Sequence, residues 1–348
     1  GTSTIPASDN AKLRKAREAG MCMVEMAKAG RKPSDLITKE VLMNAIMFDM
    51  AVAGSTNAVL HILSYAYELG IKLTLADFEK YAKEIPCINA VVPSGPYTVV
   101  DFHYAGGVMN VMKMLESKLY TDVPSMYGNT WADMLSRVKA QENKVIHSLE
   151  KPLFNEPGLK ILRGNLSPNG AIVRPTAVYD EVKYMKGKAK VFEGDRPAFE
   201  AIMAGEIVPG DIIVIRYEGC KGAPGMKELM LSIDALIGLG LDKSVGLISD
   251  ARFSGFNYGA IIGHVSPEAY DGGNIALVEN GDEIVIDIPN GEVSMLVSEE
   301  ELERRRAAWV CPPLKEEKGC LNIFAKMCRP AEEGGAMQPW DLDAKFHR

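Results

Sequence analysis

Apolar residues recur at helical spacing through roughly the first 150 residues of the chain. Leu60, Leu63 and Tyr67 stand three or four apart and are followed by Gly70, which is typical of a helix that buries one face and ends at a glycine. The same spacing, combined with capping residues such as Thr74, predicts a series of helices. The predicted helices cover residues 12–28, 35–48, 56–68, 76–84 and 101–115.

The pattern changes near residues 152–157, where short β-type runs separated by Gly-, Pro- and Asn-rich turns begin. Strands at this spacing favour a closed or nearly closed sheet. The predicted strands cover residues 159–162, 171–173, 190–192, 211–215, 245–248, 282–286 and 292–297. Helices predicted at 197–204 and 224–237 interrupt these strands, and a charged helix at 298–308 follows them.

Composition and charge narrow the class of protein. The 348 residues are 47% hydrophobic and 24% charged, which is ordinary for a soluble globular protein. The apolar stretches are too short to span a bilayer. The net charge of −7 is spread along the chain, so we expect neither a nucleic-acid nor a membrane partner. Six cysteines without a Cys-x-x-Cys pair predict reduced thiols and a cytoplasmic location.

A glycine-rich segment, residues 218–228, follows the predicted strand at 211–215 and opens the predicted helix at 224–237. Backbone N–H groups at such a junction face an anion in many proteins, and Glu228 would then lie in the first turn of the helix. A second interpretation is also open. The segment is then a plain glycine-rich turn whose glutamate favours the helix N-terminus.

Residues 249–259 form a polar, glycine-flanked loop directly after the predicted strand at 245–248. This is a usual place for catalytic groups, and Asp250, Arg252 and Ser254 offer a carboxylate, a guanidinium and a hydroxyl. A serine acts as a nucleophile or base only when it is activated. The alternative is a turn in which Arg252 pairs with Asp250. A third segment, 54–57, contains Ser55, which is first interpreted as a helix N-cap.

These segments together resemble the dihydroxy-acid dehydratase and 6-phosphogluconate dehydratase family. The resemblance is carried by five stretches that occur in the family's order and are distributed over nearly the whole chain. They are Ala-Val-Ala-Gly-Ser-Thr-Asn-Ala-Val-Leu-His at 51–61, Arg-Gly-Asn-Leu-Ser-Pro-Asn-Gly at 163–170, residues 217–228, residues 250–255 and Gly-His-Val-Ser-Pro-Glu-Ala at 263–269.

The resemblance implies a hydro-lyase that converts a 2,3-dihydroxy acid into a 2-keto acid and water, with an iron–sulfur cluster and a magnesium ion as cofactors. Carried over residue by residue, it implies that Glu228 is a magnesium ligand and that Ser254 is the catalytic proton acceptor. Arg252, Phe256, Ser55 and Asn57 are then expected to line the substrate pocket. Phe256 and the following asparagine stand where the family has small residues, so the resemblance leaves the substrate open.

The resemblance also implies an α/β fold, with a helix-rich remainder of an α/β/α domain over residues 1–152. A β-barrel-like domain with inserted helices, carrying the serine loop and a C-terminal tail, is expected over residues 153–348. The cluster cysteines of the family have no counterpart in this sequence, since Cys22, Cys87 and Cys220 do not match its ligand motifs. We therefore expect the C-terminal three-fifths of a longer member, inactive alone and without cluster ligands of its own.

Two substrate classes and one other class of function stay open on the sequence alone. The expected function is dihydroxy-acid dehydratase in branched-chain amino-acid biosynthesis, acting on a small dihydroxy acid as a homodimer. The alternative enzyme is a sugar-acid dehydratase, acting on an aldonate or on 6-phosphogluconate. The alternative outside enzymes is a truncated homologue that serves only as a binding partner.

Overall fold

The computed structural model describes residues 2–127 and 129–338. The chain divides into two compact units. The first comprises Gly1–Ala58, Leu69–Lys160 and Arg174–Ala177, and the second comprises Val59–Glu68, Ile161–Val173 and Val178–Arg348. The two domains expected from the sequence were continuous, whereas these units are interleaved along the chain.

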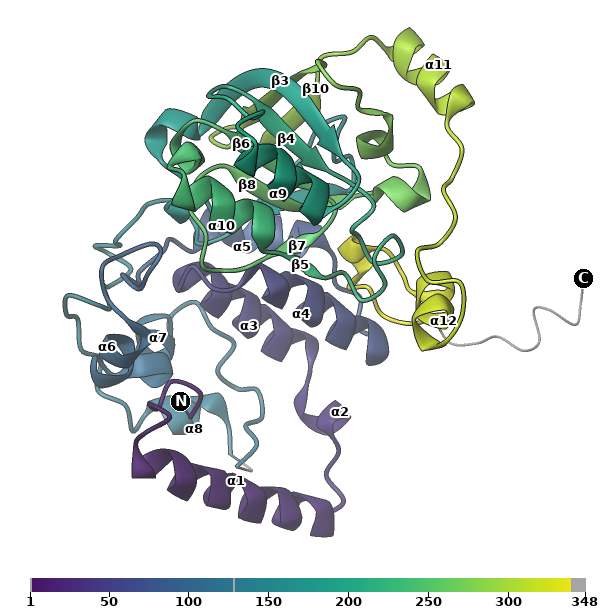
Figure 1. Ribbon diagram of the computed structural model, residues 1–348. Helices are drawn as coiled ribbons and strands as arrows, with labels where there is room; N and C mark the ends of the chain where they lie inside the picture. Colours follow the sequence, from purple (N-terminus) through teal and green to yellow (C-terminus); the bar gives the residue numbers. More distant parts are fainter. Residues whose placement is uncertain (1, 128, 339–348) are drawn as a thin grey trace, which may run out of the picture. The chain divides into compact units, whose positions relative to one another are not determined.

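The first unit is built mainly from helices, as the apolar spacing predicted (Figure 1). Its central helix, α3, is buried over much of its length and packs against α5 and α7. Ile46, Met47 and Met50 of α3 are each at most 1% exposed. The helices are α1 (Asn10–Lys28), α2 (Pro33–Leu36), α3 (Lys39–Ala51), α5 (Leu75–Glu84), α6 (Val99–Tyr104), α7 (Gly107–Met114) and α8 (Trp131–Leu135), and α4 (Thr56–Glu68) begins in this unit.

Two predicted helices are each divided in the structure. The helix predicted at 35–48 is replaced by α2 and α3, and Thr38 caps α3 by accepting the N–H of Val41 at 3.4 Å. The helix predicted at 101–115 is interrupted between α6 and α7. There Gly106 and Gly107 adopt φ of +104° and +57°, a backbone conformation that ends an α-helix and that glycine adopts at little cost.

Among the described residues of the second unit, eight strands form one nearly closed sheet with the order β1-β2-β8-β6-β4-β3-β9-β10. The central strands β3, β4, β6 and β8 are parallel, and β9 joins β3 in the antiparallel sense. Backbone hydrogen bonds of Arg163 with Gly291 (2.8 Å) and Val293 (2.7 Å) connect the two ends of the sheet. The strands are β1 (Lys160–Leu162), β2 (Gly170–Val173), β3 (Tyr184–Phe192), β4 (Ile212–Ile215), β6 (Gly246–Ser249), β8 (Ile261–Ser266), β9 (Glu283–Asp287) and β10 (Glu292–Met295).

The α/β class and the nearly closed sheet are therefore confirmed, while the α/β/α layering of the first domain stays a prediction. The interior of the sheet is apolar and includes Ile212, Val214, Ile248 and Ile262, all fully buried. The remaining helices of the second unit are α9 (Asp195–Met203), α10 (Leu231–Gly238), α11 (Glu299–Ala308) and α12 (Cys320–Met327). Across the described part of the chain, no helix is both long and apolar enough to cross a bilayer.

Helices α9 and α10 lie side by side over one face of the sheet (Figure 1). A second apolar cluster joins them to the strands, and Ile202 of α9 and Leu236 of α10 belong to it. Asp195, at the start of α9, also caps α10. Its carboxylate accepts the backbone N–H groups of Met230 and Leu231 at 3.2 Å and of Ser232 at 3.1 Å.

Replacing Asp195 by Ala should lower the free energy of unfolding by about 3 kcal/mol, because it leaves several buried donors without an acceptor. Urea denaturation followed by circular dichroism measures this change. The matched control is Glu200→Ala, an exposed acid on the same helix, which should change the value by less than about 0.5 kcal/mol. Equal effects of the two substitutions would contradict the capping role of Asp195.

Candidate functional site

Two short strands bring the glycine-rich segment and the serine loop together. Strand β5 (Glu228–Leu229) pairs in parallel with β7 (Arg252–Phe253), so that Glu228 lies opposite Arg252. Ser254 follows β7 directly. In this register Glu228 stands at the start of the paired strands and Ser254 directly after their end, two residues further along.

Ser254 is half-buried, and its Oγ accepts the backbone N–H of Phe256 at 3.1 Å. A backbone donor of this kind stabilises negative charge on the oxygen, as a serine that accepts a proton requires. The Phe256 side chain is 64% exposed and meets Tyr258 edge-on, with ring centroids 6.4 Å apart. A lining role for Phe256 stays a prediction.

Arg252 does not pair with Asp250, so that interpretation of the loop is wrong. Its guanidinium instead donates to two backbone carbonyls of the glycine-rich segment, through Nε to Met226 O and through a terminal nitrogen to Gly225 O at 3.4 Å. Arg252 thus fastens the turn that precedes Glu228 to the strand that precedes Ser254. Two of its N–H donors are thus used on backbone, and a pocket-lining role for Arg252 stays a prediction.

Two buried carboxyl groups accept hydrogen bonds from the backbone of the glycine-rich segment and the residues next to it. Asp250 accepts the N–H groups of Tyr217 at 3.1 Å, Glu218 at 3.0 Å and Ala269 at 2.9 Å. Glu268 accepts those of Lys221 at 2.9 Å and Gly222 at 3.0 Å. Side chains thereby take three backbone donors of the segment, those of Glu218, Lys221 and Gly222, that would otherwise be available to a bound anion.

Burial raises the pKa of both carboxyl groups, to about 6 for Asp250 and to about 8 for Glu268. For Glu268, the negative charge of nearby Asp250 raises the pKa further, and the backbone donors of Gly222 and Lys221 oppose the shift. Two carboxyl groups this close cannot both ionise freely. Near neutral pH the pair therefore retains a proton.

The predicted anion site at the start of a helix is wrong in two respects. Residues 224 and 225 belong to a turn, residues 226 and 227 have no regular structure, and Glu228 lies in β5 rather than in the first turn of a helix. Helix α10 begins only at Leu231, and its N-terminal N–H groups already bind Asp195. The predicted helix at 224–237 is thus shorter at its start by several residues.

His264 is a residue of this region that sequence reasoning missed. It lies on β8 with φ of +55°, an uncommon conformation for a residue with a side chain. Its ring meets Phe253 edge-on at 6.4 Å, and its buried Nε2 has no hydrogen-bond partner among the described residues. Burial, with the charges of Arg252 and His61, lowers its pKa to about 3, so the imidazole is neutral. Its only sequence signal was its place in the segment 263–269.

Ser55 and Asn57 lie in the first unit, whereas Ser254 and Glu228 lie in the second. Ser55 Oγ accepts the N–H of Asn57 at 3.2 Å, as expected of a residue that caps α4. Their assignment to a substrate pocket stays a prediction. Beneath this turn the structure reveals Asp49, an unpredicted buried carboxyl group whose pKa burial raises to about 7, against the opposing effect of Arg174.

The described residues do not fit an iron–sulfur cluster. Clusters bind thiolates, but burial raises the pKa of Cys87 to about 11 and that of Cys328 to about 12. Cys220 packs with Cys328 in an apolar cluster. Within residues 2–127 and 129–338, no group of three or more His, Cys, Asp or Glu side chains is arranged to hold a metal ion. Glu228 by itself is therefore not a complete magnesium site.

Comparison with known proteins gives matches over nearly the whole chain. A family model described as "Dihydroxy-acid/6-phosphogluconate dehydratase C-terminal" matches residues 144–335, and its N-terminal counterpart matches residues 1–134. A dihydroxy-acid dehydratase of Clostridium novyi is 44% identical over 97% of this chain and 62% of its own length. Those of Ignicoccus hospitalis and Methanosarcina barkeri are also 44% identical, over 97% and 96% of this chain and 62% and 61% of their own lengths.

The chain spans about three-fifths of the length of the curated relatives it matches. The expected placement at the C-terminal end of a longer protein is not borne out, because the N-terminal family model matches as well. The expectation of an inactive fragment lacks support for the same reason.

The raised pKa of Glu268 predicts a pH-dependent stability. Because the folded state holds the proton up to about pH 8 and the unfolded state releases it near 4.5, stability falls as pH rises through this window, by at most about 1.4 kcal/mol per pH unit. Glu268→Gln should remove this contribution. Urea denaturation at pH 5, 6.5 and 8 should give a variant-minus-wild-type difference that grows in the variant's favour, and a constant difference would contradict the shift.

Proposed function

Because the chain belongs to the dihydroxy-acid/6-phosphogluconate dehydratase family, we propose that it acts in a hydro-lyase that dehydrates a 2,3-dihydroxy acid. The product is a 2-keto acid and water. The observation that carries the proposal is the pairing of β5 with β7, which holds Glu228 opposite Arg252 and two residues from Ser254. The names of the relatives support the same reaction.

In this proposal Ser254 accepts the proton from C2 of the substrate. The C3–oxygen bond then breaks and the departing hydroxide takes up a proton that balances the one removed from C2, so that one water is lost and the resulting enol becomes the 2-keto acid. The N–H of Phe256 supports negative charge on Ser254 Oγ. Arg252 keeps the loop in place through its bonds to Gly225 and Met226.

Glu228 is the carboxylate that this chain would offer to a magnesium ion, a hard cation that prefers oxygen ligands. One carboxylate is an incomplete ligand set, and the described cysteines do not suit an iron–sulfur cluster. Accordingly, no step of the proposed reaction is assigned to either group. The part proposed for this chain is to orient Glu228 and to move a proton at Ser254.

The choice between a short dihydroxy acid and a phosphorylated sugar acid depends on the backbone donors of the second unit. A phosphate group is commonly held by the N–H groups of glycine-rich loops and helix N-termini. In this chain Asp250 and Glu268 take three N–H groups of the glycine-rich segment, those of Glu218, Lys221 and Gly222, and Asp195 takes those at the start of α10. This occupancy supports an unphosphorylated dihydroxy acid over 6-phosphogluconate.

Ser254→Ala should lower kcat about 10²- to 10⁴-fold, because it removes the proton acceptor. Formation of 2-keto acid from 2,3-dihydroxyisovalerate by oxygen-free preparations measures the effect. Ser136→Ala, which changes an exposed serine of the first unit, serves as the control and should retain full turnover. Equal turnover in both variants would refute the role of Ser254. A wild-type chain that binds the acid without turning it over would favour the non-catalytic alternative.

The substrate prediction is tested by competition. 2,3-Dihydroxyisovalerate should be the better substrate by kcat/KM, and 6-phosphogluconate and inorganic phosphate should compete weakly, because side chains already bind three N–H groups of the glycine-rich segment and three at the start of α10. Inhibition constants from steady-state assays measure this. Tight competition by 6-phosphogluconate together with weak competition by unphosphorylated gluconate would instead indicate a phosphate site.

A further inference from the structure

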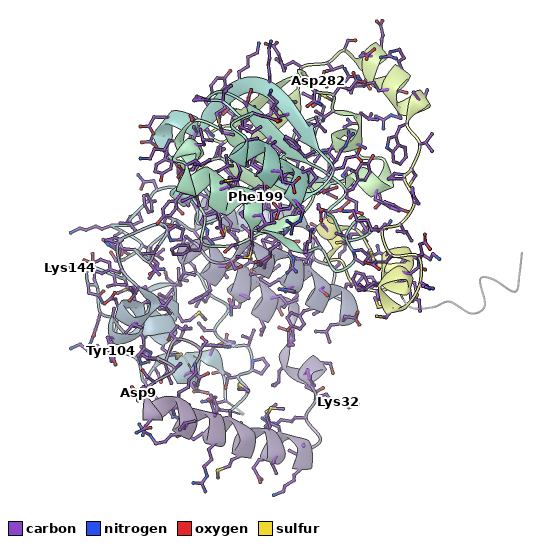
Figure 2. The ribbon with its side chains drawn as sticks, in the orientation of Figure 1. Asp9, Lys32, Tyr104, Lys144, Phe199 and Asp282 are labelled. Atoms are coloured by element: carbon purple, nitrogen blue, oxygen red, sulfur yellow. The ribbon has the colours of Figure 1, made fainter. Side chains whose placement is uncertain are left out.

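Residues 309–319, which we call the C-terminal strap, form an irregular segment between α11 and α12. Its first end is fixed because Arg305 of α11 binds the Asp282 carboxylate through two nitrogens, at 2.5 and 3.0 Å (Asp282 is labelled in Figure 2). The strap is mostly exposed. Two of its side chains nevertheless reach the start of the glycine-rich segment.

Both of these side chains contact Tyr217. Trp309 donates its indole N–H to Tyr217 Oη at 3.0 Å, and Lys315 Nζ donates to the Tyr217 carbonyl at 2.7 Å. Tyr217 has φ of +62°, which is unfavourable for a residue with a bulky side chain. Such a conformation persists only where surrounding contacts impose it. The strap supplies two of these contacts.

Lys315 also compensates a buried charge. The Glu218 side chain is only 3% exposed, and its two oxygens lie 3.1 Å from Lys315 Nζ and 3.0 Å from Lys227 Nζ. A buried carboxylate is costly unless cations and hydrogen bonds surround it. The two lysines come from different segments, one from the strap and one from the end of the glycine-rich segment. Glu218 therefore connects these segments electrostatically.

The connection leads directly to the candidate site. Lys227 immediately precedes Glu228, which pairs through β5 with Arg252 of β7. A shift of Lys227 would therefore move Glu228 relative to Ser254. We propose that Lys315 is a positioning residue, which holds the glycine-rich segment and Glu228 in place through Glu218 and Lys227. The structural part of this inference depends only on the contacts described above. Its catalytic consequence rests on the proposed function.

Hydrogen exchange provides the direct test, because the segment contains amides whose partners are known. The N–H groups of Tyr217 and Glu218 bind Asp250, and those of Lys221 and Gly222 bind Glu268. In the wild-type chain they should exchange slowly. Lys315→Met should raise their exchange rates about tenfold or more, because the segment opens more often. Amides of β4 and β6 should keep their rates.

Two further variants distinguish a positioning role of Lys315 from a general loss of stability. Lys315→Arg keeps the charge and should restore slow exchange. Lys318→Met changes an exposed lysine of the same strap and should leave the exchange rates unchanged. Unaltered exchange in Lys315→Met would overturn the proposal, as would equal acceleration in Lys318→Met. Acceleration spread equally over β4 and β6 would also overturn it, since that result indicates loss of global stability.

The catalytic consequence is measured with 2,3-dihydroxyisovalerate. Lys315→Met should lower kcat at least about tenfold, and Lys315→Arg should recover most of it. Faster exchange without any loss of kcat would overturn the positioning role. If the wild-type chain itself has no turnover, the proposed function fails, but the exchange result still decides whether the strap holds the segment.

Discussion

The candidate site depends on two buried carboxyl groups that accept hydrogen bonds from backbone N–H groups. Asp250 and Glu268 together accept hydrogen bonds from five backbone N–H groups in and around the glycine-rich segment. A loop without regular structure would otherwise leave these donors buried and unpaired, at a cost of about 1–3 kcal/mol each. Asp250 and Glu268 thus accept hydrogen bonds from backbone N–H groups of the kind that bind an anion in other glycine-rich loops. The position of Glu228 follows from this arrangement.

The sequence predicted the elements whose signals are local. Thr74 marks a helix start that the structure confirms, and short apolar runs between turn residues located most strands of the sheet. The prediction failed where a tertiary contact decides the outcome. Strands β5 and β7 have two residues each and exist because Arg252 and Asp250 hold the adjoining loops. A window of sequence carries no signal for such a pair.

The same distinction applies to the site residues. Ser254 and Glu228 were found because they lie in segments that resemble a family, and the structure brings their two segments together. Residues that act through three-dimensional contacts, such as His264 and Glu268, were only parts of a recognisable stretch. Their burial, their altered acidity and the left-handed backbone of His264 cannot be inferred from residue type.

The two-residue length of β5 and β7 restricts where the chain can accept an insertion. In a strand, a slip of one residue moves each side chain by about 3.3 Å and turns it to the opposite face. An insertion beside Met226 or Arg252 would therefore turn Glu228 away from the serine loop. The turn after α10 lies in the connection between β5 and β7. An insertion there leaves the pairing of β5 with β7 unchanged. Length variation among close relatives should accordingly be tolerated there and excluded from the short strands.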